Sequence, residues 1–249
     1  MKIGIIGLGL IGGSIFKDLK KLNYNVIGVS KSQIGENIYD NYSVLKDCEI
    51  VFICSAMNKT LSILDELENI LSPQTIVTDV CSLKKFVCQK RRPYKFIPSH
   101  PMAGTEKKGY ENSFEGMFNG AKWVVTPVFG EDDRLIEIIK MLGATPIVTT
   151  PEKHDEAVAL ISHMPMLISQ AIFKTAQNNE LALNIASSGF RDMTRLAMSN
   201  EEMANDMITM NSENIQNAVL KLYKSIGDLT NSDYLEQIKE IKLNRQKMF

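Results

Sequence analysis

The chain has 249 residues, 44% of them hydrophobic and 23% charged, which is enough for one large domain or two smaller ones with full cores. Its 28 basic and 29 acidic residues give a formal net charge of -1, which argues against a nucleic-acid or membrane-surface binder. No apolar run approaches the roughly 18 to 20 residues of a membrane span, and the glycine-interrupted start lacks a signal-peptide cleavage site. We therefore expect a cytoplasmic protein whose partners are neither nucleic acid nor membrane.

Neither the cysteines nor the histidines have the spacing of a metal site. The four cysteines lack the paired spacing of zinc ligands, and we interpret them as free, mostly buried thiols: Cys48, Cys54, Cys81 and Cys88. The three histidines, at positions 100, 154 and 163, are far apart in sequence. The sequence therefore predicts no metal centre.

The first half of the chain alternates short apolar, β-branched runs with helical stretches. The predicted strands are Lys2–Ile6, Asn25–Val29, Glu49–Cys54, Thr75–Val80, Tyr94–Ile97, Trp123–Thr126 and Pro146–Thr149. Most are apolar through the middle, which is typical of strands covered on both faces of a parallel sheet. The predicted helices between them include Ile11–Leu22, Leu61–Leu71 and Asp133–Leu142. This alternation predicts an α/β fold with a doubly wound sheet.

After about residue 150 the strand pattern stops. Proline at 151 suits the first position of a helix, and long amphipathic stretches follow: Asp155–Ala176, Asn200–Ile226 and Asp233–Lys247. We therefore expect two domains, an α/β domain over residues 1–150 and an all-helical domain over residues 151–249. A junction without a Pro- or Gly-rich linker suits a substrate cleft between them.

A GxGxxG motif at residues 7–12 follows the first predicted strand and opens a helix. Gly7 permits the tight turn, Gly9 lets the backbone approach a pyrophosphate, and Gly12 lets the helix pack close to the strand. The N–H groups and the positive dipole end of the helix favour phosphate. We expect this turn, including Leu10 and Ile11, to bind a dinucleotide.

The residues after the second strand indicate which dinucleotide. An NAD-binding fold usually places an acid there to hold the ribose 2′-hydroxyl, whereas this strand is followed by Ser30, Lys31 and Ser32. Two hydroxyls and an ammonium can bind the 2′-phosphate of NADP, so NADP is favoured over NAD. Alternatively, Lys31 is solvated and Ser30 holds the ribose. Ser55, after the third strand, is a further expected cofactor contact.

Two segments carry candidate catalytic groups, DVCSLK at 79–84 and SHPMAGTE at 99–106. The first follows a strand at the carboxyl edge of the sheet, where open α/β folds bind ligands. In the second, His100 lies at the end of a short strand beside proline, suited to accept a proton near neutral pH. Alone it would more often be structural. Beside a dinucleotide fold we expect it to accept the hydroxyl proton of an alcohol whose hydride passes to nicotinamide.

Arg191 and Arg195 flank Asp192 in SSGFRDMTR at 187–195. On a helix the two arginines would share a face and could bind a substrate carboxylate, since guanidinium pairs with carboxylate bidentately. A surface ion-pair pattern through Asp192 is the equal alternative.

Together these motifs resemble the prephenate/arogenate dehydrogenases of tyrosine biosynthesis. The matching segments appear in family order: GLGLIGGS at 7–14, VTDVCSLK at 77–84, SHPMAGTEKKG at 99–109, HD at 154–155, SHMP at 162–165 and SSGFRDMTR at 187–195. The resemblance implies a Rossmann-type N-terminal domain and a helical C-terminal domain that forms a homodimer. It also implies oxidative decarboxylation of arogenate or prephenate, with hydride transfer to a nicotinamide dinucleotide.

The resemblance also implies roles for single residues. His100 matches the catalytic histidine that hydrogen-bonds the substrate C4 hydroxyl, and Ser82 matches a serine that contacts the same hydroxyl. Arg195 matches the arginine that binds a substrate carboxylate, while Thr105 and Glu106 match pocket residues.

Position 163 matches a family histidine that we expect to be structural or to support the site without being catalytic. Position 154 matches one that we expect to lie at a helix start or between the two domains. Some prephenate-using members carry a second histidine where this chain has Met166. In this departure, and in having Lys31 in place of an acid, the chain is more similar to the cyanobacterial NADP-dependent arogenate enzymes. The chain ends soon after its last predicted helix, so we expect neither a regulatory domain nor a fused chorismate mutase.

Two other functions fit parts of the pattern. A β-hydroxyacid dehydrogenase has related architecture but usually relies on a lysine of the helical domain, and no matching constellation is evident here. A non-catalytic NADP sensor would leave His100 and the arginine pair unexplained. Finally, Met203, Met207 and Met210 share a helical face with Ile208 beside it, which indicates either core packing or a subunit interface.

Overall fold

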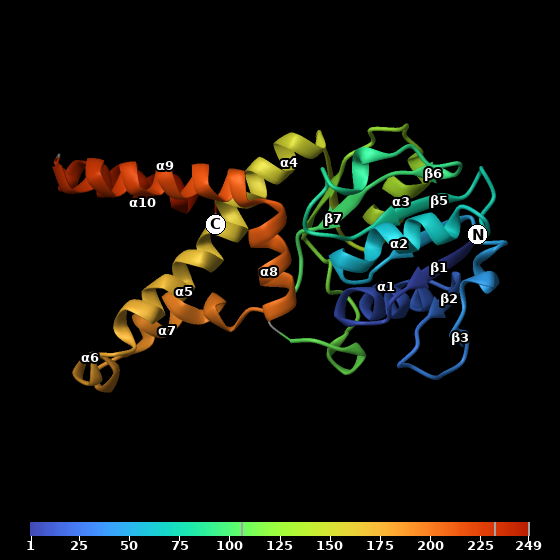
Figure 1. Cartoon of the computed structure of the whole chain (residues 1–249), viewed down its shortest axis with the longest axis horizontal. Coiled ribbons are helices and arrows are strands. Elements are labelled where there is room, and N and C mark those ends of the chain that lie inside the picture. Colours follow the sequence, from blue (N-terminus) through green and yellow to red (C-terminus); the bar gives the residue numbers. More distant parts are fainter. Residues whose placement is uncertain (106, 232, 249) are drawn as a thin grey trace.

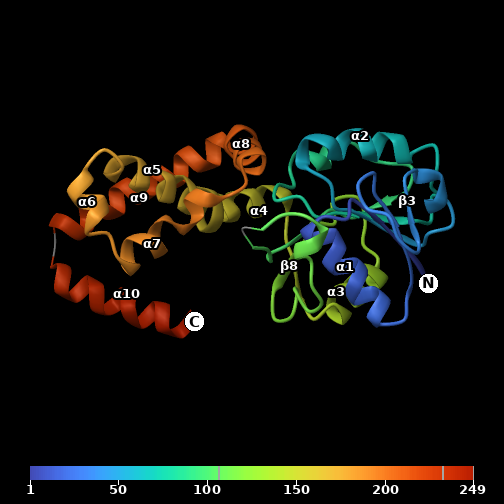
Figure 2. The ribbon, with the colours of Figure 1, turned by 90° about the horizontal axis from the view of Figure 1, so that it is seen from below.

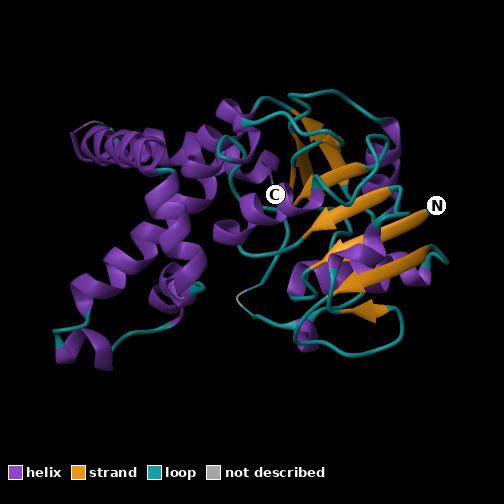
Figure 3. Cartoon of the chain, turned by 45° about the vertical axis from the view of Figure 1, so that its right-hand side comes forward, coloured by secondary structure: helices purple, strands orange, loops and turns teal. Residues whose placement is uncertain are grey.

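The computed structural model describes residues 1–105, 107–231 and 233–248, with an α/β part and a helical part side by side (Figure 1). The α/β part contains a six-stranded parallel sheet in the order β3-β2-β1-β4-β5-β6 (Figure 3). Its strands are β1 (Lys2–Ile6), β2 (Asn25–Val29), β3 (Ile38–Tyr39), β4 (Ile50–Ile53), β5 (Ile76–Asp79) and β6 (Lys95–Phe96). This order confirms the doubly wound, Rossmann-type fold and places its switch point between β1 and β4.

Helices cover both faces of this sheet. They are α1 (Leu10–Lys21), α2 (Met57–Leu67) and α3 (Asp133–Met141). Apolar residues of α1 and α3, among them Ile15 and Ile138, pack against one face in a cluster with Ile5. Leu64 of α2 packs in a separate cluster on the other face, with Val51. Burial on both sides explains why these strands are apolar throughout.

Two strands predicted from the sequence form a separate sheet. Here β8 (Lys122–Val125) pairs in parallel with β9 (Thr145–Val148) and antiparallel with a short strand, β7 (Ser99–Pro101). The sequence pattern predicts these two strands but does not indicate that they leave the parallel sheet. At the edge of this sheet, Ile147 and Val148 of β9 are 42% and 59% exposed.

The helical part begins directly after β9. Its helices are α4 (Pro151–Val158), α5 (Met164–Ala176), α6 (Glu180–Asn184), α7 (Ser188–Thr194), α8 (Glu201–Met210), α9 (Ser212–Asn231) and α10 (Tyr234–Met248). A π-helical segment, Ala159–His163, joins α4 to α5, and a 3-10 segment, Arg195–Met198, follows α7. The amphipathic stretch Asn200–Ile226 spans two helices, α8 and the first part of α9, separated at Asn211. Figure 2 shows α10 lying along the outside of the other helices.

The first long helix corrects one sequence expectation. Pro151–Ala176 runs without interruption for 26 residues and, with a mean hydropathy of 1.3 in its most apolar window, is long and apolar enough to cross a membrane. Its apolar stretch is not continuous in the sequence, because Ser162, His163, Ser169 and Gln170 interrupt it. One such helix is weak evidence for a span, since helices of soluble proteins meet the same criteria. The absence of a membrane partner stays a prediction.

Candidate active site

The glycine turn at the end of β1 leaves space for a phosphate group. Gly7 has a φ of +86°, and a Cβ there would lie 2.7 Å from the carbonyl oxygen of Cys54. A Cβ at Gly12 would lie 2.0 Å from the carbonyl oxygen of Gly7, so the turn and α1 approach too closely for any side chain. A Cβ at Gly9, just before α1, meets nothing within 4 Å. Open space before a twelve-residue helix fits a bound pyrophosphate.

The other expected cofactor contacts lie at the same edge of the sheet. Ser30 follows β2 and Ser55 follows β4, and both strands pair in parallel with β1. Ser30 Oγ accepts hydrogen bonds from the backbone N–H of Ser32, at 3.3 Å, and of Gln33, at 3.1 Å, which closes a tight turn. Lys31 is exposed at this turn. The sheet therefore brings these residues together with the glycine turn.

A buried ion pair holds the segment that follows β5. Lys84 and Asp79 have fully buried side chains, and the Lys84 ammonium donates to the Asp79 carboxylate. Asp79 Oδ2 also accepts the backbone N–H of Cys81 at 3.0 Å, and Lys84 Nζ donates to the carbonyl oxygen of Ser99 at 2.6 Å. Between them, half-buried Ser82 donates from Oγ to Met57 Sδ at 3.7 Å. The pair thus ties the Ser82 segment to β7.

His100 lies in the middle of β7, opposite Val124 of β8, rather than at a strand end as expected. The hydroxyl of its neighbour Ser99 donates to the carbonyl oxygen of Asp79 and accepts from the indole N–H of Trp123, both at 2.9 Å. These bonds fix the backbone of His100 against β5. Its imidazole is half-buried and faces the helical part.

His100 joins a hydrogen-bonded chain that crosses between the two parts of the molecule. Its Nδ1 lies 2.9 Å from Nε2 of His154 in α4, and His154 Nδ1 lies 2.7 Å from Asp155 Oδ1. Asp155 in turn accepts the backbone N–H of Lys84, at 2.8 Å, and of Lys85, at 2.9 Å. His154 thus lies in the first turns of α4 and contacts the other part of the molecule, where the sequence expected a helix-start or interdomain residue. Its contact with His100, across 54 residues, is not visible in local sequence.

All three histidines of the chain meet in this region. Asn211 Nδ2 lies 2.9 Å from the Asp155 carbonyl oxygen and 3.2 Å from Nδ1 of the fully buried His163. Their separation in sequence therefore did not indicate separation in space. Within residues 1–105, 107–231 and 233–248, no group of three or more His, Cys, Asp or Glu side chains is arranged to hold a metal ion.

Burial sets the charge state of these imidazoles. It lowers the pKa of His100 well below its usual 6.5, and positive charge on His154, Lys84 and His163 would lower it further. Desolvation likewise lowers the pKa of His163 to about 4. His100 is therefore neutral at neutral pH, which is the state needed to accept a proton.

The cysteines are free, as expected. Desolvation raises the pKa of Cys48 to about 11 and that of Cys88 to about 12, and it raises those of Cys54 and Cys81 as well. Because a thiolate is the reactive form, these thiols are poor nucleophiles at neutral pH.

Three of the residues expected to bind substrate, Arg191, Arg195 and Thr105, lie at exposed positions. Helix α7 ends at Thr194, so Arg195 starts a 3-10 segment and does not share one α-helical face with Arg191. Both arginines are exposed, and Arg191 Nε lies 3.9 Å from Asp192 Oδ1, in the surface ion-pair pattern. Thr105 is exposed on the loop after β7. Glu106 lies outside the described residues.

Arg195 nevertheless lies close to the junction. Its neighbour Leu196 packs, with Met102 from the loop after β7, against an apolar cluster that joins the two parts of the molecule. The α/β part contributes Met57, Cys81 and Leu83, and the helical part contributes Val158, Met166, Ala204 and Met207. Met166 is 4% exposed, so its thioether occupies this cluster.

The methionine face of α8 is partly buried and partly exposed. Met207 is 6% exposed and packs in the junction cluster, as core packing predicts. Met203 and Met210 are about two-fifths exposed, at 40% and 42%, and stay available for a subunit contact.

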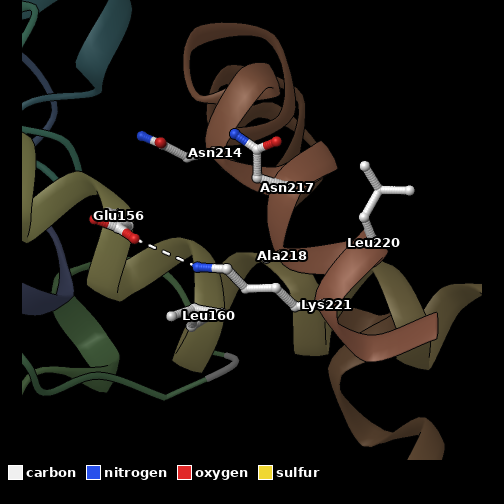
Figure 4. A pocket seen from close by; sticks show the side chains of 7 residues that line it. All are labelled: Glu156, Leu160, Asn214, Asn217, Ala218, Leu220 and Lys221. Atoms are coloured by element: carbon white, nitrogen blue, oxygen red, sulfur yellow. Dashed lines mark hydrogen bonds and ion pairs between the residues drawn. The ribbon is translucent and has the colours of Figure 1, made fainter. Parts of the chain in front are cut away.

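A separate hollow between α4 and α9 contains none of the predicted site residues (Figure 4). Glu156 and Leu160 line one side, and Asn214, Asn217 and Lys221 of α9 line the other. The Lys221 ammonium lies 3.5 Å from the Glu156 carboxylate across it. The candidate active site is therefore the junction around His100, not this hollow.

Comparison with known proteins identifies the family. Residues 25–161 match the family model described as prephenate dehydrogenase, nucleotide-binding domain, and residues 150–242 match prephenate dehydrogenase, dimerization domain. The chain is 30% identical to prephenate dehydrogenase of Bacillus subtilis over 85% of its own length and 64% of the relative's, so it spans just under two thirds of that relative.

Solved structures agree. Synechocystis arogenate dehydrogenase superposes with a TM-score of 0.80 at 32% identity, covering 99% of this chain and 97% of that one. Prephenate dehydrogenase from A. aeolicus, in complex with hydroxyphenyl propionate and NAD+, gives a TM-score of 0.87 at 26% identity, covering 100% and 98%. On the family match, the order of its sheet and the arrangement of its site, this chain belongs to the prephenate dehydrogenase family.

Proposed function

We propose that the protein is a cytoplasmic dehydrogenase of tyrosine biosynthesis that oxidises and decarboxylates arogenate or prephenate to tyrosine or 4-hydroxyphenylpyruvate, with NADP as hydride acceptor. Residues 1–150 would bind the dinucleotide, and residues 151–249 would complete the substrate site and the dimer. The observation that carries the proposal is a neutral imidazole, His100, at the junction of the two parts, next to Ser99, which hydrogen-bonds Asp79 at the carboxyl end of β5. Similarity to Synechocystis arogenate dehydrogenase supports the substrate class.

In the proposed reaction, His100 accepts the proton of the ring C4 hydroxyl, and Ser82 hydrogen-bonds the same oxygen. Nicotinamide chemistry supplies the acceptor for the hydride of that carbon. The bond to the ring carboxylate then breaks, its electron pair completes the aromatic ring, CO2 leaves, and His100 returns the proton to the phenolic oxygen. Because aromatisation provides the driving force, the protein chiefly has to orient the reactants.

The preference for NADP rests on the turn after β2. Exposed Lys31 can pair with a 2′-phosphate, and Ser30 can still donate its own hydroxyl proton while it accepts from the turn. Gly7, Gly9 and Gly12 with the start of α1, including Leu10 and Ile11, would hold the pyrophosphate, and Ser32 and Ser55 would complete the contacts.

The homodimer is proposed to form through the helical part. The matching family model over residues 150–242 is described as a dimerization domain. Helix α10 has no buried residue, yet Tyr234, Ile238 and Ile241 share one face and are 58%, 41% and 51% exposed. A second copy would cover apolar surface of this kind.

A four-way steady-state assay tests the function. Arogenate and prephenate are each measured with NADP and NAD, and a simple 3-hydroxy acid serves as the substrate of the alternative dehydrogenase class. We expect reduction of NADP with at least one cyclohexadienyl substrate, a higher kcat/KM with NADP than with NAD, and no turnover of the 3-hydroxy acid. NADP binding without turnover of either ring substrate would identify a cofactor sensor instead.

Arg195→Ala tests the proposed carboxylate contact. Loss of a charge-assisted, bidentate hydrogen bond costs about 1.5 to 3 kcal/mol, so KM for the ring substrate is expected to rise by about tenfold or more with a smaller change in kcat. Arg195→Lys, which keeps the charge but not the fork, should fall between the two. An unchanged KM in Arg195→Ala would assign the carboxylate to another residue.

A further inference from the structure

The hydrogen-bonded chain from Asp155 to His100 has a defined direction. Asp155 accepts two backbone N–H groups, which is the behaviour of an ionised carboxylate, and such a group only accepts hydrogen bonds. The nitrogen 2.7 Å from it, His154 Nδ1, must therefore carry a proton. In a neutral His154 ring, the proton on Nδ1 leaves Nε2 with a lone pair. His100 Nδ1, 2.9 Å from that lone pair, must then be the donor.

We propose that His154 and Asp155 are positioning residues that hold His100 in the tautomer with its proton on Nδ1, which leaves the lone pair of Nε2 free to accept the proton of the substrate alcohol. This inference rests on the proposed function and adds a second imidazole to its machinery. His154 touches neither substrate nor cofactor in this scheme. When the alcohol proton moves to His100 Nε2, the positive charge formed is stabilised through His154 Nε2 by the Asp155 carboxylate.

The same contacts link proton acceptance by His100 to the position of the helical part against the α/β part. His154 and Asp155 belong to α4, whereas His100, Lys84 and Lys85 belong to the α/β part. The two backbone bonds to Asp155 fix α4 on the segment that also carries Ser82. The base and the hydroxyl that face the substrate are therefore aligned by one carboxylate.

The tautomers can be read directly from the full-length protein. Two-bond 1H–15N correlation spectra show which ring nitrogen carries the proton, and the chain has only three histidines, so single substitutions assign them. Near neutral pH we expect the Nδ1–H form for both His100 and His154. An Nε2–H form of His100 in the wild-type protein would overturn the proposal. His163→Leu removes a buried imidazole that is not part of the Asp155–His154–His100 hydrogen bonds, and it should leave the His100 signals in place.

Asp155→Asn removes the charge that stabilises a protonated His100. Asp155 Oδ1 accepts both the His154 Nδ1 proton and the Lys84 N–H, whereas Oδ2 accepts only the Lys85 N–H, so the amide oxygen should take the Oδ1 position and keep both tautomers. We expect the Nδ1–H form of His100 to persist and kcat to fall by about 10²- to 10⁴-fold, with little change in KM for ring substrate. Glu156→Gln makes the same chemical change at the next residue, which is exposed and faces Lys221, and should alter neither spectrum nor kcat.

His154→Leu and His154→Gln are a second, independent pair of variants that test the same proposal. Both keep Asp155 on its backbone donors, so the α4 contact is retained. The leucine removes the acceptor for His100 Nδ1 and should lower kcat, whereas the glutamine oxygen can still accept and should restore part of it. Equal kcat in the two variants, or an unchanged kcat in Asp155→Asn, would show a purely structural role. If the wild-type enzyme oxidises neither ring substrate, the proposed function fails, while the spectra still decide the tautomer.

Discussion

His100→Asn is expected to lower kcat by about 10²- to 10⁴-fold, the usual contribution of a positioned general base. Asparagine keeps a polar side chain of similar reach and can still hydrogen-bond His154, but it cannot take up the alcohol proton. Because His100 lies on β7, away from the glycine turn at β1, the Kd for NADP should stay close to that of the wild type. Stopped-flow single turnover with the ring substrate, together with a fluorescence titration of NADP, separates these two quantities.

The pH dependence of this reaction checks the same residue. Desolvation lowers the pKa of His100 well below 6.5, so the imidazole is already deprotonated at neutral pH. Activity should therefore be level around neutrality and fall only as the pH drops through that lowered pKa, where the base becomes protonated. The asparagine variant should lack this acidic limb. A His100→Asn enzyme with nearly full kcat and an unchanged pH profile would remove His100 from the chemistry.

How much of this site is visible in the sequence depends on how local each signal is. The glycine turn was predictable because its three glycines act within one strand-to-helix connection, and the apolar strands were predictable because both faces of the sheet are buried. Ser30, Ser55 and Ser82 could be placed at one edge, since parallel strands end on the same side. These features follow from spacing of a few residues and from the topology of the sheet.

The features that sequence reasoning missed depend on contacts between distant segments. The separate β7-β8-β9 sheet arises because the chain reverses direction between β7 and β8, and no local pattern marks that turn. The sequence expected His154 at a helix start or between the domains, but not its contact with His100, which lies on another element. The placement of Arg195 depends on where α7 ends, and element ends are weakly specified by sequence. These positions depend on tertiary contacts and not on residue type alone.

Lys84→Met is expected to destabilise the folded protein by about 3 to 5 kcal/mol, the cost of removing one partner from a buried ion pair. The side chains of Lys84 and Asp79 are both fully buried, so the carboxylate left behind cannot recover water. The Ser99 carbonyl oxygen would also lose its donor. Urea unfolding at a fixed protein concentration measures the change, since the stability of a dimer depends on concentration.

The double variant Lys84→Met/Asp79→Asn separates charge from packing. Asparagine keeps an oxygen for the Cys81 N–H but carries no charge, so the double variant should be more stable than Lys84→Met alone. Equal stability of the two would mean that the loss comes from the lysine's packing and its bond to Ser99. Both variants lack the lysine that holds β7 next to His100, so kcat should be lowered in both. Neutralising Asp79 removes only the unpaired charge. The double variant should therefore regain stability more fully than it regains kcat.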